Sequence, residues 1–215
     1  MSLSSKSLQK KRAKKAEKRK VIKKARTGLL GSLGFDQEWA TVAKGSIEDV
    51  LVPTHIFEEG IGNIWFSRQL PDGRYAMAGF LVDTYCLGIK NALYVISTPE
   101  NYRNNLLRIE GRFGEEPMSS EHPAYARKLV ERAEAYAHEL GFQPVSDYKQ
   151  ARKIFGDVDA ESCPTPMTFG KDGKPYYICG PNDTPTFQRR VIRQLEKSCG
   201  PGGYDWLIGL PDEKY

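Results

Sequence analysis

The stretch that decides the fold is Ile61-Gly-Asn-Ile-Trp-Phe-Ser-Arg-Gln-Leu70, followed by Pro71-Asp72-Gly73 and then by residues 74–86. The first run is rich in β-branched and aromatic residues, which favour strands. Proline presets its own backbone dihedral and glycine takes a positive one, so the three residues between the runs predict a tight turn. The second run carries the apolar series Phe80, Leu81, Val82, Tyr85 and Cys86. The stretch therefore predicts a β-hairpin.

A third strand and four helices are expected further along the chain. Residues 88–91 predict another turn and residues 92–97 a third strand, which extends the hairpin into an antiparallel meander. Apolar spacing and capping residues predict helices at 99–109, 121–140, 147–155 and 184–198. Ser119 or Ser120 is the expected cap of the second helix, and Ser146 that of the third.

A second hairpin is expected near the C-terminus. Its strands would be residues 167–170 and 174–179, joined at Lys171-Asp172-Gly173, and residues 204–210 would form a short closing strand. We predict an α+β fold, in which an antiparallel sheet (meander plus hairpin) packs with three to four helices. Residues 35–215 would form a single domain, preceded by a flexible basic arm and linker at 1–34, disordered when free.

The arm contains twelve Lys or Arg residues among its first 26 and a single acid, Glu17. It therefore carries about +11, whereas the whole chain carries +5, so the remainder is mildly acidic. Such a run favours a polyanionic partner, RNA or DNA, through phosphate contacts. A solvated tail, a membrane-surface segment and a targeting signal are the alternatives. The predicted phosphate-binding residues are Lys10, Lys11, Arg12, Lys14, Lys15, Lys18, Arg19, Lys20, Lys23, Lys24 and Arg26.

The helix predicted at 184–198 is a second basic element. Arg189, Arg190 and Arg193 fall on one side of it, whereas Phe187, Val191 and Leu195 mark the opposite, buried side. The three arginines are candidates for a second nucleic-acid contact. An ordinary amphipathic surface helix explains the same spacing.

Catalytic and cofactor signals are weak. Asp83 lies inside an apolar strand, where a buried carboxylate needs a partner or a metal ion, although a solvent-facing position or a pair with Lys90 or an Arg explains it more simply. The scattered cysteines and three histidines form no zinc-ligand spacing, no Cys-His or Ser-His pair and no phosphate-binding loop, so we expect no metal and no cofactor. Aromatic residues on the predicted strands could stack bases, but core packing accounts for them (Trp65, Phe66, Tyr75 and Tyr85).

Several segments resemble stretches of bacterial proteins of unassigned function. They are residues 67–74, the run Gly79-Phe-Leu-Val-Asp-Thr-Tyr-Cys-Leu-Gly88, residues 140–144 and residues 169–175. The resemblance implies a bacterial-type cytosolic protein and adds no site residue.

We therefore predict a cytoplasmic accessory protein that binds RNA or DNA through its arm, without catalysis of its own. A larger protein or ribonucleoprotein assembly is a further expected partner, and a membrane is not, because no apolar run approaches the roughly 18 residues of a span. One alternative is a metal-dependent nuclease that uses Asp83 with other carboxylates. The other is a protein-interaction module of a larger complex.

Overall fold

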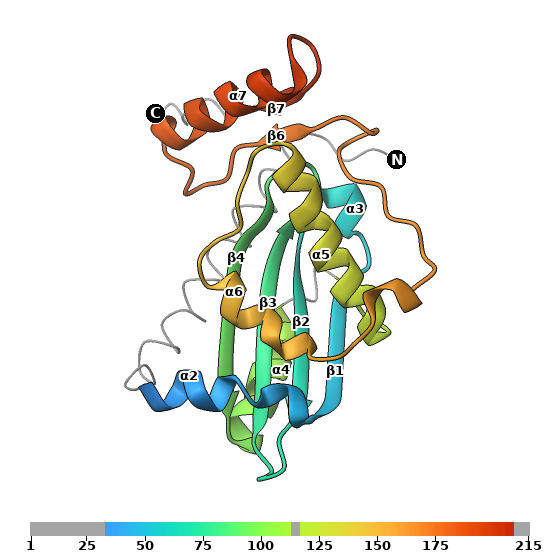
Figure 1. Ribbon diagram of the computed structural model, residues 1–215, viewed down its shortest axis with the longest axis vertical. Coiled ribbons are helices and arrows are strands. Elements are labelled where there is room, and N and C mark those ends of the chain that lie inside the picture. The colour runs from blue at the N-terminus through green and yellow to red at the C-terminus, as the bar shows by residue number, and fades with distance from the viewer. Residues whose placement is uncertain (1–32, 113–116, 209–215) are drawn as a thin grey trace.

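The computed structural model describes residues 33–112 and 117–208. Within them a five-stranded antiparallel sheet has the order β4-β3-β2-β1-β5, which confirms the predicted α+β class and the meander (Figure 1). Of the predicted arm and linker at 1–34, residues 1–32 lie outside the described residues, and the last two residues belong to the first described helix. The strands of the sheet are β1 (Ser46–Pro53), β2 (Ile61–Gln69), β3 (Tyr75–Asp83), β4 (Gly88–Ser97) and β5 (Met118–Ser120).

The four predicted helices are present, and two short ones were not predicted. The α-helices are α2 (Leu33–Trp39), α3 (Ile56–Glu59), α4 (Pro99–Arg112), α5 (Pro123–Glu139), α6 (Tyr148–Ala151) and α7 (Pro185–Cys199). Three single turns of 3-10 helix accompany them, namely η1 (Val42–Lys44), η2 (Arg152–Phe155) and η3 (Ala160–Ser162). Because η2 directly continues α6, the helix predicted at 147–155 is an α-helical turn followed by a tighter one.

The predicted turn between β2 and β3 is confirmed. The backbone N–H of Leu70 donates to the carbonyl of Arg74 at 2.7 Å, and Gly73 takes a φ of 83°. The next turn was predicted wrongly at residues 88–91, because the chain reverses at residues 84–87 instead. The reason is a side chain: Asp83 Oδ1 accepts from the backbone N–H groups that follow it, which closes the turn before Gly88.

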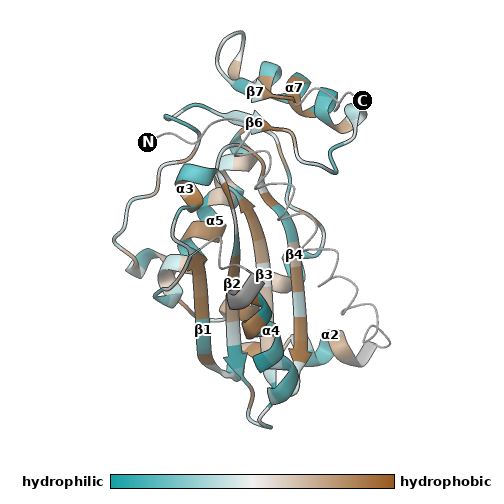
Figure 2. Cartoon of the chain, turned by 180° about the vertical axis from the view of Figure 1, so that it is seen from behind, coloured by the Kyte–Doolittle hydropathy of each residue, from teal (hydrophilic) through white to brown (hydrophobic). Residues whose placement is uncertain are grey.

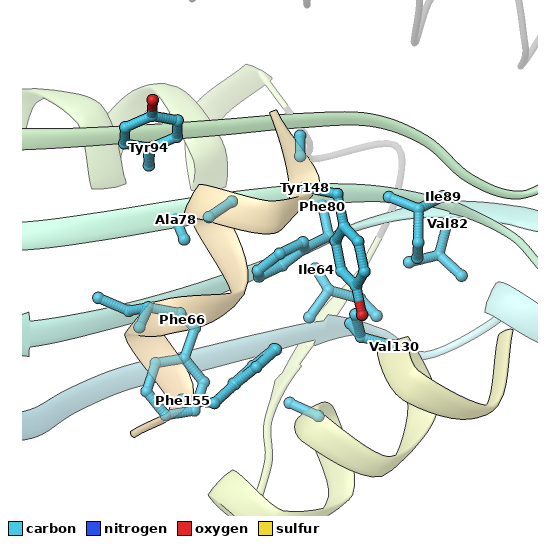
Figure 3. Packing of buried hydrophobic residues seen from close by; sticks show 14 of the residues in the cluster. Ile64, Phe66, Ala78, Phe80, Val82, Ile89, Tyr94, Val130, Tyr148 and Phe155 are labelled. Carbon is cyan, nitrogen blue, oxygen red and sulfur yellow. The ribbon is translucent and has the colours of Figure 1, made fainter. Parts of the chain in front are cut away.

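One face of the sheet is covered by α5, by α6 with η2 and, at one end, by α2 with η1 (Figure 1). Alternate residues of β2 and β3 point toward these helices. Phe66 and Phe80 contact Phe155 of η2, with ring centroids 5.3 and 5.2 Å apart, and Tyr148 packs beside Phe80 (Figure 3). The main core therefore lies between the sheet and the helical segments that follow it.

Two helix starts differ from the prediction. Ser119 and Ser120 are not caps, because they belong to β5 and pair with β1. His122 caps α5 instead, and its Nδ1 accepts from the backbone N–H of Ala124 at 3.2 Å. The residue before α6 is Asp147, not Ser146, and its side chain makes no capping hydrogen bond.

The opposite face of the sheet carries α4 (Figure 2). Tyr102 of this helix lies parallel to Tyr75, with ring centroids 4.2 Å apart. The hydroxyl of Tyr102 is 2.6 Å from Ser67 Oγ of β2 and donates to Asp49 of β1. These polar contacts join α4 to two strands of the sheet. Burial raises the pKa of Tyr102.

The predicted second hairpin is only a tight turn. Lys171 and Lys174 exchange two backbone hydrogen bonds, but residues 167–170 form no strand. The returning segment, β6 (Tyr176–Ile178), pairs instead with β7 (Asp205–Leu207), and the two strands are parallel. Because α7 connects them, residues 176–207 form a β-α-β unit at one end of the larger sheet (Figure 1).

Candidate nucleic-acid interface

The basic helix α7 begins and ends where its sequence indicates. Thr184 Oγ1 accepts from the backbone N–H of Phe187 at 3.2 Å, and Pro185 occupies the first turn. Gly200 ends the helix with a φ of 72°. Local sequence therefore sets both ends of the element that carries the candidate arginines.

The arginines lie on the exposed side of this helix. Val191 and Leu195 are 1% and 0% exposed, whereas Arg189, Arg190 and Arg193 all face solvent. The spacing of the sequence predicted this division correctly. That these arginines bind nucleic acid stays a prediction.

No carboxylate in the described part of the chain pairs with these three arginines. The guanidinium of Arg190 lies 5.1 Å from the ring centroid of Phe187, and that of Arg189 is 3.4 Å from Thr186 Oγ1. Glu196 is the only acid in the helix. The outer side of α7 therefore has an excess of positive charge that is available to an anion.

Specific contacts fasten α7 to the end of α5. Gln194 Nε2 and Ser198 Oγ both donate to the carbonyl of Leu140, at 3.0 and 2.9 Å. Leu140 ends α5, and Val191 and Leu195 pack on it in one apolar cluster. These contacts hold the basic side of α7 in a defined position on the larger sheet and its helices.

Asp183 anchors the start of the same helix. Its Oδ2 accepts from the hydroxyl of Tyr177 and from the backbone N–H of Gly180, each at 2.8 Å, and lies 3.5 Å from Lys90 Nζ of β4. Burial, with the nearby carboxylate of Asp183, raises the pKa of Tyr177. The carboxylate thus ties β4, β6 and the beginning of α7 together.

Asp83, the candidate metal ligand, is completely buried, which corrects the interpretation that it faces solvent. Its Oδ1 accepts from the backbone N–H groups of Tyr85, Cys86 and Leu87, at 3.1, 3.0 and 3.4 Å. Residues 33–112 and 117–208 contain no group of three or more His, Cys, Asp or Glu that could hold a metal ion. Within them, Asp83 has a structural role in the turn.

The four cysteines are free, with Cys86 and Cys163 buried and Cys179 and Cys199 half-buried.

The aromatic residues of the strands are core residues, as the simpler interpretation predicted. Trp65, Phe66 and Tyr85 are at most 4% exposed, and Tyr75 stacks on Tyr102.

Sequence reasoning missed one exposed aromatic residue. Trp206 of β7 is 51% exposed, whereas residues 204–210 were predicted only as a short closing strand. No signal in the sequence distinguishes Trp206 from the apolar residues around it.

Among the described helices, none is long and apolar enough to cross a membrane. No protein-family model matches the chain, and no curated protein and no solved structure matches it either. The geometry and charge of the chain itself therefore carry the functional argument.

Proposed function

We propose that the protein is a nucleic-acid-binding accessory protein, without catalysis of its own, which contacts phosphates through its Lys/Arg-rich N-terminal arm. The charge of the arm carries this proposal. Twelve cations within 26 residues can replace condensed counterions on a nucleic acid, and release of those counterions favours binding. Phosphate contacts of this kind bind without reading the base sequence.

The outer side of α7 supports the proposal with a second, folded set of cations. Arg189, Arg190 and Arg193 are exposed, and no described acid neutralises them. Arginine suits phosphate because its planar guanidinium donates two parallel hydrogen bonds. The many cations of the arm would capture the polyanion, and the arginines of α7 would add contacts in a fixed geometry.

Deletion of residues 1–26 tests the main part of the proposal. Binding of a fluorescent oligonucleotide is measured by anisotropy over a range of salt concentrations, for the intact protein and for the deletion. We expect affinity of the intact protein to fall steeply with salt, by about 0.7 to 0.9 logarithmic units per phosphate contact for each tenfold rise. The deletion should lose most of the binding and of the slope. Unchanged binding after the deletion would refute the proposal.

A triple substitution tests the helix. Arg189→Gln, Arg190→Gln and Arg193→Gln together should lower the salt slope by about 2 units, if all three arginines contact phosphates. The matched control substitutes three other exposed arginines, Arg103, Arg108 and Arg132, on α4 and α5. It removes the same charge from a different place. Equal effects of the two triple variants would mean that only net charge matters and that α7 is not a contact surface.

A further inference from the structure

Trp206 is a large apolar side chain on the surface of the β-α-β unit. The chain has three tryptophans, and the other two, Trp39 and Trp65, are 0% and 4% exposed. Trp206 is 51% exposed. An exposed indole is a common anchor of binding surfaces, because it supplies a large rigid contact area.

Strand register places this indole on the side of the small sheet that faces α7. Trp206 is paired with Tyr177 in the parallel ladder, and paired residues of neighbouring strands point to the same face. Tyr177 is completely buried in the apolar cluster with Val191 and Leu195 of α7. The residues on the other face, Ile178 and Leu207, pack on Tyr85 instead.

A side-chain contact brings the start of β7 against the last turns of the helix. Tyr204, two residues before Trp206, packs against the apolar cluster that contains Val191 and Leu195 of α7. The two-stranded sheet gives Trp206 a strand neighbour on one side only, within the described residues. The indole and the arginines are therefore carried by two neighbouring elements of the β-α-β unit, β7 and α7 (Figures 1 and 2).

We propose that Trp206 stacks on an unpaired base, so that the surface formed by Trp206 and the α7 arginines selects single-stranded over double-stranded nucleic acid. The proposal rests on the proposed function, since the arginines supply its phosphate contacts. An aromatic ring next to exposed cations is the arrangement by which proteins bind single strands, because every base offers a flat face and every nucleotide a phosphate. In a duplex those faces are already stacked inside the helix.

Tryptophan fluorescence of the intact protein tests this directly. Because Trp39 and Trp65 are buried, the solvent-sensitive part of the emission comes from Trp206. The probes are oligothymidylate of about 12 nucleotides, within the usual site sizes, and the same strand annealed to its complement. We expect the single strand to quench the emission strongly and the duplex to leave it nearly unchanged.

Substitution of the indole measures its contribution. Trp206→Ala should weaken single-strand binding about 5- to 150-fold, the equivalent of about 1–3 kcal/mol for one stacked base, and should leave the salt slope and duplex binding unchanged. Trp206→Phe keeps an aromatic ring and should retain most of the affinity. The matched control is Leu107→Ala on α4, since Leu107 is 64% exposed and equally apolar.

The outcomes separate the two proposals. If the intact protein binds neither probe, the proposed function fails and this inference fails with it. If both probes bind but Trp206→Ala binds the single strand as well as the intact protein does, only the inference is overturned. Sedimentation of the intact protein and of Trp206→Ala tests a competing role of the indole, self-association. If the substitution abolishes self-association but leaves single-strand affinity unchanged, the inference is also overturned.

Discussion

Replacement of Arg68 by methionine should destabilise the protein more than any exposed arginine substitution. Arg68 lies on β2 and is 4% exposed. Its guanidinium donates to the carbonyls of Ile154 and Phe155, at 2.6 and 2.9 Å, and to those of Gly45 and Ala43, at 2.7 and 3.2 Å. The first two carbonyls lie at the end of the helical segment of α6 and η2, and that of Phe155 also accepts from the backbone N–H of Val158 at 3.2 Å. One side chain of the sheet therefore joins η1, the residue that follows it and the end of η2.

The magnitude follows from these four hydrogen bonds. Methionine fills a similar volume but removes four hydrogen bonds, at about 1 kcal/mol each. Part of that loss is recovered, because a buried charge no longer has to be desolvated. The same desolvation lowers the pKa of Arg68 in the folded protein. We expect a net loss of about 3 kcal/mol, which corresponds to a decrease of about 1.5 M in the urea midpoint for a slope of about 2 kcal/mol per molar.

Urea unfolding followed by circular dichroism measures the change. Arg68→Lys keeps the charge but has fewer donors in a less extended geometry, so its midpoint should fall between those of the intact protein and Arg68→Met. Arg132→Met, at an exposed position of α5, is the control and should shift the midpoint very little. A shift below about 0.5 M for Arg68→Met, at an unchanged slope, would refute the reasoning.

Two further predictions concern buried polar groups. Asp83→Ala should lower the free energy of unfolding by about 2–4 kcal/mol, because three backbone N–H groups lose their acceptor, whereas Asp83→Asn keeps an acceptor oxygen and should cost less. If the intact protein shows a Mg²⁺-dependent cleavage, and Asp83→Asn folds normally but abolishes it, the carboxylate has a catalytic role in addition to its structural one. Burial raises the pKa of Tyr102, Tyr148 and Tyr177, so the folded state keeps protons that unfolded tyrosines lose near pH 10. The free energy of unfolding should therefore be insensitive to these groups below about pH 10 and fall above it, and a constant urea midpoint between about pH 8 and 11 would contradict this.

Local patterns predicted the elements that depend on neighbouring residues. The meander of β2, β3 and β4 follows from two strand-forming runs around Pro71-Asp72-Gly73 and a third run close behind. The helices α5 and α7 follow from their apolar spacing and from the prolines and glycines at their ends. The exposed side of α7 follows from the same spacing, so the sequence predicted the exposure of the three α7 arginines correctly.

Other elements depend on partners far away in the chain. β1 contains Glu48, Asp49 and Pro53 and has no strong strand pattern, yet it pairs with β2 on one side and β5 on the other. β6 was predicted to pair with the residues just before it, but it pairs with β7 some thirty residues later, because α7 carries the chain back in the same direction. Neither of these strand pairings can be predicted from the residues next to the strands in the sequence.

The sequence by itself determined the basic arm, the strand meander at residues 61–97 and the charged side of α7, because charge, turn chemistry and periodicity are properties of adjacent residues. Only the tertiary structure decided the roles of Asp83, Arg68 and Trp206. A carboxylate among apolar residues became the acceptor of a turn, and an arginine in a strand became the donor to four distant carbonyls. A tryptophan in an apolar run stayed exposed. Burial and hydrogen-bond partners are set by which segments meet in space, and that is decided by the packing of the whole chain.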